Sequence, residues 1–325
     1  MYHGKAGPVA EPAGRVVGRP ELLAHRPDLA EVWDEADAAF PVRVTRSFLD
    51  RMNLDDPNDP LALQVLPSPS ELVPAPGDLD DPVGDLRMSP LPWVVRKHPD
   101  RVLVLLTKRC QIYCRYCFRR NIEHGEQDPS DAELRAALAY AKTSGAHEVI
   151  FSGGDPLAVT DEQLFSAIDA VRPEVPVIRV HTRAPIALPS RVTPALVAGL
   201  QKRAPVWVIV HTNHPRELAP DVDEALARLV DAGIPVLNQS VLLAGVNDDP
   251  SVLQALSEAL VERRVFPYYL HHPDAASGNA AFRVTFERGL EIYAELGRRV
   301  SGLALPAYVV DPPDGSGKIP VSTLS

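Results

Sequence analysis

The 325-residue chain is 45% hydrophobic and 23% charged, a composition that excludes a wholly disordered chain and a disulfide-rich miniprotein. Its formal net charge of −10 argues against a nucleic-acid partner. No apolar run reaches the roughly 18 residues of a membrane span and the N-terminus lacks an apolar signal core, so we expect a cytoplasmic protein that engages no membrane.

Residues 1–95 lack a regular alternation of apolar and polar positions. Within them, residues 32–40 and 44–52 show the apolar spacing of short helices. Residues 55–84 are rich in proline, which breaks helices and favours turns. We therefore expect an extended segment that wraps over another part of the protein, with a partly disordered arm as the alternative.

From about residue 100 the chain alternates short apolar runs with amphipathic stretches. The expected strands are 102–107, 148–153, 175–182, 206–212, 234–241 and 265–270, with a closing strand at 307–311. The expected helices are 130–145, 160–172, 193–203, 220–233 and 251–264. Several of them begin with a Ser, Thr or Asp that can cap a helix. Repeated strand–helix units predict parallel strands, either in a partial (β/α)6 barrel or in a doubly wound sheet.

The cysteines form the first candidate site. All of them follow the first expected strand, with the spacing CxxxCxxC: Cys110, Cys114 and Cys117. Three thiolates can bind three irons of a [4Fe–4S] cluster and leave the fourth open, whereas an electron-transfer ferredoxin uses four. Structural zinc also needs a fourth ligand, which His124 is near enough in sequence to supply. The spacing favours the cluster, with zinc and an unrelated group of thiols as the alternatives.

A glycine pair follows the second expected strand, in the segment FSGGDP at 151–156. Gly153 and Gly154 allow the backbone to approach a ligand closely, although an ordinary turn explains an isolated glycine pair as well. In parallel α/β folds the chemistry lies where strands end and loops begin. The pair therefore belongs to the same candidate site as the cysteines.

The cysteine loop and the Gly-Gly-acidic turn resemble motifs of the radical S-adenosylmethionine (SAM) superfamily. Segments in order through most of residues 98–321 further resemble the lysine 2,3-aminomutase family: HPDRVLVLLTKRCQIYCRYCFRR, FSGGDP, HTRAPIALPSRVTPAL, HTNHPREL, LNQSVLLAGVND, PYYLHHPD and YVVDPPDGSGKIPV. The resemblance implies a partial (β/α)6 radical SAM barrel at 96–305, with an N-terminal wrap at 1–95. A short C-terminal lid at 306–325 would complete the chain.

The resemblance also implies three cofactors and the residues that hold them. The cysteines would bind a [4Fe–4S] cluster, and Lys318 matches the family's pyridoxal-phosphate lysine. Its loop has Asp314-Gly315-Ser316-Gly317 where the family often has four glycines. Arg101 matches a phosphate-binding arginine, and Lys97 stands where the family has another, although lysine cannot form a bidentate clamp. The residues expected to contact SAM are Gly153, Gly154, Asp155, Thr182, His211 and Gln239.

Three further residues indicate the substrate. Arg119 matches the family's carboxylate-binding arginine, a role that suits a bidentate guanidinium. Asp274 and Asp311 match the aspartates that hold the distal ammonium of lysine. The expected reaction is a 2,3-amino shift on L-lysine that gives β-lysine, catalysed by an isomerase. His271 stands where family members that act on free lysine tend to have tyrosine. The shorter branch of the family, which is linked to elongation factor P, has histidine at this position.

Two alternative functions stay open. Within the family, the enzyme could supply β-lysine for the modification of elongation factor P. In another class, the chain could be a catalytically inert iron–sulfur or zinc protein. The family resemblance further implies a reductase or flavodoxin-type electron donor and a homo-oligomer. The longer aminomutases carry a C-terminal zinc-binding extension with cysteines; no cysteine follows Cys117 here, so we expect no structural zinc.

Overall fold

A computed structural model describes residues 16–122 and 128–323. Its main sheet has nine strands in the order β11-β10-β9-β8-β7-β6-β5-β4-β3. These strands are β3 (Val94–Val95), β4 (Arg101–Leu105), β5 (Glu148–Ser152), β6 (Val177–Thr182), β7 (Val206–His211), β8 (Val236–Val241), β9 (Phe266–His271), β10 (Ala307–Val310) and β11 (Ile319–Pro320). Strands β4 to β10 are parallel, and β3 and β11 add antiparallel edges.

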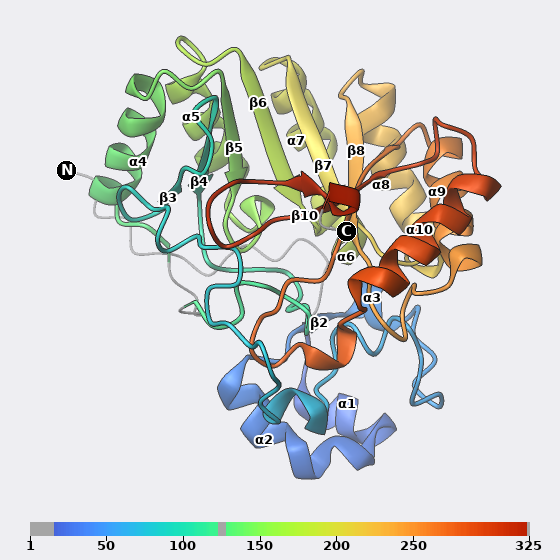
Figure 1. Cartoon of the computed structure of the whole chain (residues 1–325). Helices are drawn as coiled ribbons and strands as arrows, with labels where there is room; N and C mark the ends of the chain where they lie inside the picture. Colours follow the sequence, from blue (N-terminus) through green and yellow to red (C-terminus); the bar gives the residue numbers. More distant parts are fainter. Residues whose placement is uncertain (1–15, 123–127, 324–325) are drawn as a thin grey trace.

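The strand order distinguishes the two architectures expected from the sequence. A doubly wound sheet reverses its order partway and carries helices on both faces. Here the parallel strands follow one another in chain order, so right-handed crossovers place the connecting helices on one side of the sheet. Figure 1 shows these helices flanking the curved sheet. The fold is therefore a partial (β/α) barrel, to which β10 adds a seventh parallel strand.

Local sequence rules account for the barrel helices. The five expected helices are present as α4 (Asp131–Thr143), α5 (Asp161–Val171), α7 (Pro194–Gln201), α8 (Pro220–Asp231) and α9 (Pro250–Glu262). Ser130 and Thr160 cap α4 and α5 in capping boxes, which satisfy backbone N–H groups at each helix start. A further helix, α10 (Phe286–Arg299), lies outside the expected set, although the Thr285 side chain caps it by accepting a hydrogen bond from the Arg288 N–H.

The N-terminal segment agrees with its expectation only in part. Helices α1 (Arg19–His25) and α2 (Ala30–Ala39) are present and lie below the sheet in Figure 1. The helix expected at 44–52 is wrong at both ends: β2 (Val44–Thr45) pairs with β1 (Val16–Val17), and α3 covers Arg46–Leu49. The Thr45 side chain accepts a hydrogen bond from the Phe48 N–H, which places the start of α3 after that residue.

Residues 55–84 pack against the barrel through turns and one 3-10 helix, η2 (Pro69–Leu72). Their apolar side chains, among them Leu61 and Val65, join the same hydrophobic cluster as the barrel strands. Arg115 after β4 is buried, donates to the Phe40 carbonyl at 2.8 Å and pairs with Glu71. These contacts hold the segment over the strand ends. Across the described ranges, we find no helix that combines the length and the apolar character needed to cross a bilayer.

Candidate active site

One large cavity opens at the carboxyl ends of the parallel strands. It encloses about 2000 Å³, including the solvent at its mouth. Every site residue expected from the sequence lines it: Lys97, Arg101, Cys110, Cys114, Cys117, Arg119, Gly153, Gly154, Asp155, Thr182, His211, Gln239, Asp274, Asp311 and Lys318. Residues that are far apart in the chain therefore meet in one place, because parallel strands in chain order align their ends along one edge.

The cysteine loop begins just after β4. Its turn is closed by a hydrogen bond from the Cys117 N–H to the Cys114 carbonyl at 2.9 Å. Burial raises the pKa of the Cys110 thiol well above its usual value and that of Cys117 to about 11. The thiols of Cys110 and Cys117 are therefore protonated when no metal is bound, and binding iron must displace those two protons.

The arrangement of the thiols bears on the choice of metal. Within residues 16–122 and 128–323, no three His, Cys, Asp or Glu side chains converge closely enough to hold a single ion. The irons of a cubane sit at separate corners, so a cluster needs thiols that are spread around a larger volume. His124, the fourth zinc ligand considered from the sequence, lies outside the described residues.

The glycine pair packs against the cysteine loop. The Gly154 N–H donates to the Thr107 carbonyl at 2.7 Å, and the Asp155 N–H donates to the Arg109 carbonyl at 2.8 Å. A Cβ atom at Gly153, where φ is +132°, would lie 2.1 Å from the Thr107 carbonyl oxygen; one at Gly154 would lie 2.2 Å from that of Arg109. Both glycines are thus required by the close approach of the loop backbone, which joins loop and turn into one unit.

Asp155 and Thr182 fix the turn that follows β6. The Asp155 carboxylate accepts hydrogen bonds from the Thr182 hydroxyl at 2.6 Å and from the N–H groups of Leu157, Arg183 and Ala184 at 2.8, 2.7 and 3.1 Å. Each of its oxygens therefore already accepts two bonds. In this structure the two side chains hold the turn after β5 and the turn after β6 together, and both turns form part of the cavity wall.

Arg183 is a site residue that the sequence analysis did not single out, although it lies within the HTR motif. Its guanidinium donates to the Cys114 Sγ and the Tyr116 hydroxyl, each at 2.7 Å. It also donates to Gln64 Oε1 at 2.7 Å and to Glu217 Oε2 at 3.0 Å. This buried network ties the N-terminal segment, the cysteine loop and the end of β7 together.

Three polar side chains on neighbouring strands face the cavity. His211 Nε2 lies 2.7 Å from the Tyr116 hydroxyl, and burial lowers the pKa of its imidazole well below the usual value, so it is neutral. Gln239 is its partner in the β7–β8 register. Among the described residues, none offers a hydrogen bond to the buried His181 Nε2. That atom therefore remains available for a further hydrogen bond at the cavity wall.

A chain of alternating charges crosses the cavity. Lys318 Nζ lies 3.5 Å from Asp311 Oδ2, and Asp311 Oδ1 lies 3.5 Å from Lys97 Nζ. Lys97 Nζ is in turn 3.2 Å from Asp85 Oδ1, and Asp85 Oδ2 is 2.8 Å from Arg119 Nη2. Four of these residues were expected in the site; Asp85, from the N-terminal segment, was not.

Asp274 completes the carboxylates of the cavity. Burial and the nearby Asp311 raise the pKa of Asp274 to about 7, against the opposing effect of Lys318 and Lys97. Two carboxylates that share a confined space resist being ionised together. A ligand cation placed between them would relieve that repulsion, so the pair is suited to bind an ammonium group.

The loop that carries Lys318 is held against the N-terminal segment. Gly315 and Gly317 have φ angles of +86° and +76°, a conformation that favours glycine. A Cβ at Gly315 would lie 2.2 Å from Met88 Cε, and one at Gly317 would lie 1.9 Å from His98 Cε1. In Figure 1 this dark red loop reaches across from β10 toward the segment before β4. Its glycines therefore place the lysine by close packing.

If Lys318 carries pyridoxal phosphate, as the family resemblance implies, Gly317→Ala should weaken the binding of that cofactor while the iron content stays unchanged. The methyl group would both clash with His98 and strain a left-handed backbone, which costs about 1–3 kcal/mol or roughly 5- to 150-fold in affinity. Absorbance titration with pyridoxal phosphate measures the change. Gly302→Ala is the matched control, because its Cβ would meet no atom within 4 Å. Equal affinities in the two variants would contradict this account of the loop.

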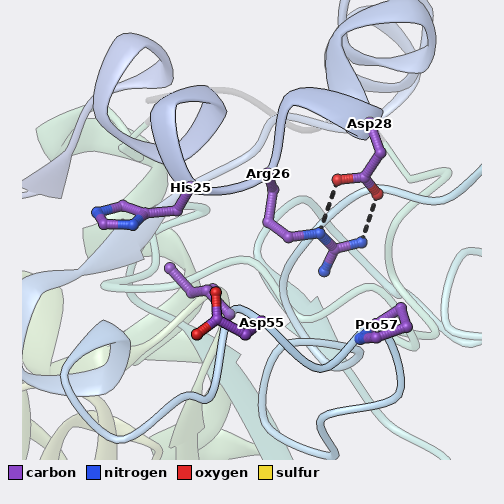
Figure 2. A pocket seen from close by; sticks show the side chains of 6 residues that line it. His25, Arg26, Asp28, Asp55 and Pro57 are labelled. Carbon is purple, nitrogen blue, oxygen red and sulfur yellow. Dashed lines mark hydrogen bonds and ion pairs between the residues drawn. The ribbon is translucent and has the colours of Figure 1, made fainter.

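A second hollow lies on the N-terminal segment. It encloses about 500 Å³ including open solvent and is lined by His25, Arg26, Asp28, Leu54, Asp55 and Pro57. Figure 2 shows Arg26 and Asp28 paired with each other across two hydrogen bonds, of 2.7 and 2.8 Å. None of the expected site residues lines it, so the chemistry belongs to the large cavity.

Comparison with known proteins gives concordant results. The profile of the Radical SAM superfamily matches residues 104–254. The L-lysine 2,3-aminomutases of Acetoanaerobium sticklandii and Clostridium subterminale are each 42% identical over 282 residues, which cover 86% of this chain and 68% of the relative. That of Escherichia coli is 40% identical over 276 residues, covering 83% of this chain and 80% of the relative.

Solved structures resemble the chain more distantly. Streptococcus suis SuiB bound to S-adenosylmethionine is 13% identical, with a TM-score of 0.49 over 66% of this chain and 51% of its own. The barrel assignment therefore rests on the strand order and register of this chain.

Proposed function

The chain belongs to the lysine 2,3-aminomutase family of radical SAM enzymes, and from this premise we propose that it converts L-lysine to β-lysine with pyridoxal phosphate attached to Lys318. As a member of the family it is an isomerase that uses a [4Fe–4S] cluster and SAM. The observation that carries the proposal is that one cavity contains three thiols, an amine, and charged side chains suited to both ends of a lysine molecule.

The residues of the cysteine loop fit the cluster. When bound, the cluster and SAM together supply the radical that removes a hydrogen atom from the substrate. Cys110, Cys114 and Cys117 leave one iron without a protein ligand, which is the corner where SAM would bind. The Arg183 guanidinium lies 2.7 Å from Cys114 Sγ, so it would hold the Cys114 side chain in place and stabilise its thiolate. The neutral His211 and the side chain of Gln239 would face SAM without adding charge.

The cavity also fits pyridoxal phosphate. When bound, this cofactor carries the migrating amino group between neighbouring carbon atoms. Lys318 offers the amine for its attachment, and the cations of Lys97 and Arg101 line the same cavity for its phosphate. His181, whose buried Nε2 lacks a partner within the described part of the chain, would hydrogen-bond a polar group of the cofactor or substrate.

The substrate would lie between opposite charges. The Arg119 guanidinium would bind the carboxylate of lysine, and Asp274 and Asp311 would hold its distal ammonium. Fixing both ends orients the reacting carbons toward the cluster and the cofactor. The covering N-terminal segment and the Lys318 loop would keep water away from the radical.

Anaerobic assay of the reconstituted protein tests this proposal. With the cluster, SAM and pyridoxal phosphate loaded, L-lysine is expected to yield β-lysine, detected by chromatography, and glutamate is expected to give no product. Absence of lysine turnover in the fully loaded protein would overturn the assignment.

Lys318→Ala tests the attachment of the cofactor. Borohydride reduction of the wild type should leave pyridoxal phosphate covalently bound to the protein, and this variant should lose that label because it removes the amine assigned to the bond. Its iron content should not change. The exposed Lys202→Ala serves as the matched control and should keep the label. A label retained in Lys318→Ala would move the attachment elsewhere.

The remaining partners follow from the chemistry. The cluster must be reduced by one electron at a time, so we include a flavodoxin-type or reductase donor in the proposal. A cluster on free thiols needs a reducing compartment such as the cytoplasm. A homo-oligomer is proposed on family membership, and light scattering measures it.

A further inference from the structure

We propose that Asp85 is a positioning residue that holds the Arg119 guanidinium and the Lys97 ammonium as one anion-binding pair, for the carboxylate of the amino acid and the phosphate of the cofactor. This inference rests on the proposed function. It adds a residue from the N-terminal segment, which lies outside every motif of the site. The evidence is the geometry of its two carboxylate oxygens, each of which serves one of the two cations.

The contact leaves the binding edge of the arginine open. Asp85 Oδ2 accepts from Arg119 Nε at 2.9 Å and lies 2.8 Å from Nη2, so it occupies the side of the guanidinium. Nη1 donates to the Gly153 carbonyl at 3.3 Å, which fixes the plane of the group relative to the cysteine loop. A guanidinium has five N–H donors. One N–H on each of Nη1 and Nη2 remains for a bidentate carboxylate at the end of the group.

Asp85 is not free to withdraw. Its own N–H and that of Leu86 donate to the Asp81 carboxylate at 2.8 and 3.0 Å. Next to it, Arg87 donates to the Pro313 carbonyl in the loop that carries Lys318. A Cβ at Gly84 would lie only 2.4 Å from that same carbonyl oxygen. These contacts hold the segment against the Lys318 loop and fix the position of Asp85 beside the two cations.

Charge balance supports the same reading. Asp85 is 6% exposed, and the pKa of its carboxyl group is lowered, because Arg119 and Lys97 together outweigh the effect of burial. Unpaired cations in such a cavity would repel each other and rotate toward solvent. An anion between them keeps both side chains pointing into the site. The alternative is a plug, in which Asp85 merely occupies the place of a ligand and is displaced by it.

Asp85→Asn separates the two readings. A positioning role predicts that the KM for L-lysine rises about tenfold or more, since the charge-assisted bond that aligns Arg119 is lost, while kcat at saturating lysine changes little. Asp85→Glu, which keeps the charge, should recover part of the loss. A plug predicts the opposite, a lower KM in Asp85→Asn. Asp80→Asn, the same change of charge at an exposed position of the same segment, is the matched control.

A second readout needs no turnover. Pyridoxal phosphate and pyridoxal, which lacks the phosphate, are titrated into each protein, and the ratio of their affinities reports on Lys97. Asp85→Asn should lower this ratio several-fold, and Asp80→Asn should not. A wild type without lysine turnover would overturn the proposed function, and this ratio would still decide the role of Asp85. Unchanged or tighter binding in Asp85→Asn, or equal losses in Asp80→Asn, would overturn the inference.

Discussion

Alanine at any one of Cys110, Cys114 or Cys117 is expected to abolish both the iron–sulfur cluster and all turnover. With three protein ligands proposed for the cluster and the fourth iron left to SAM, the set has no redundancy. Iron analysis should give close to four irons per chain in the wild type and almost none in the variants. A variant that kept full iron and turnover would show that the loop is not the site.

A loop residue that binds no metal provides the control for these variants. Gln111 lies between the first two cysteines and lines the same cavity, and Gln111→Ala should keep its iron. The same metal analysis tests the expectation that the protein holds no structural zinc. Stoichiometric zinc alongside a complete cluster would contradict it.

The sequence predicts those features that depend on order along the chain. Parallel strands in chain order place Cys110, Gly153 and Asp311 at one edge, so motifs found at strand ends were bound to meet. Helix starts were also predictable where a capping residue is present, as at Ser130 and Thr160. The strand order and the helix starts together account for the cavity that contains every expected residue.

The contacts between distant segments could not be predicted in the same way. Asp85 directly follows the proline-rich residues 55–84, in a part of the chain without periodicity, and its proposed role depends on how residues 55–95 fold over the strand ends. Arg183 follows a candidate residue in the HTR motif, but only the structure shows its bond to Cys114 Sγ. The glycine pair illustrates a third limit: the sequence indicates a close approach, whereas the approaching group is the backbone of the cysteine loop.

The substrate assignment depends on Asp274 and Asp311, and the Asn variant of each is expected to lose most lysine turnover. Removing one partner of a buried ion pair costs about 3–5 kcal/mol, because the other charge is left uncompensated. At about 1.4 kcal/mol per tenfold change, lysine binding should weaken by roughly two to three orders of magnitude. Both variants should keep their cluster and still cleave SAM slowly, since the three cysteines are unchanged.

Comparing glutamate with lysine tests the substrate assignment separately from the family assignment. If the distal group of the true substrate were a carboxylate, removing negative charge at Asp274 or Asp311 would improve its binding. Turnover of lysine and glutamate is therefore measured for the wild type and for each variant. A wild-type preference for glutamate, or lysine turnover that is indifferent to both substitutions, would leave the family intact and reject lysine. Asp274→Asn is the cleaner variant, because Asp311 also pairs with Lys97 and Lys318.

The raised pKa of Asp274 adds a pH dependence with a definite sign. Because its pKa is about 7 in the ligand-free site, Asp274 is mostly protonated below that pH and ionised above it. If Asp274 holds the ammonium of lysine, only its ionised form can do so, and binding must release a proton at low pH. The KM for lysine should therefore rise as the pH falls, by up to about tenfold per unit below roughly pH 7, and level off above it. In Asp274→Asn this slope should vanish while any dependence from other groups persists. A wild-type slope that survives unchanged in Asp274→Asn would mean that another group titrates, and that Asp274 does not hold the ammonium.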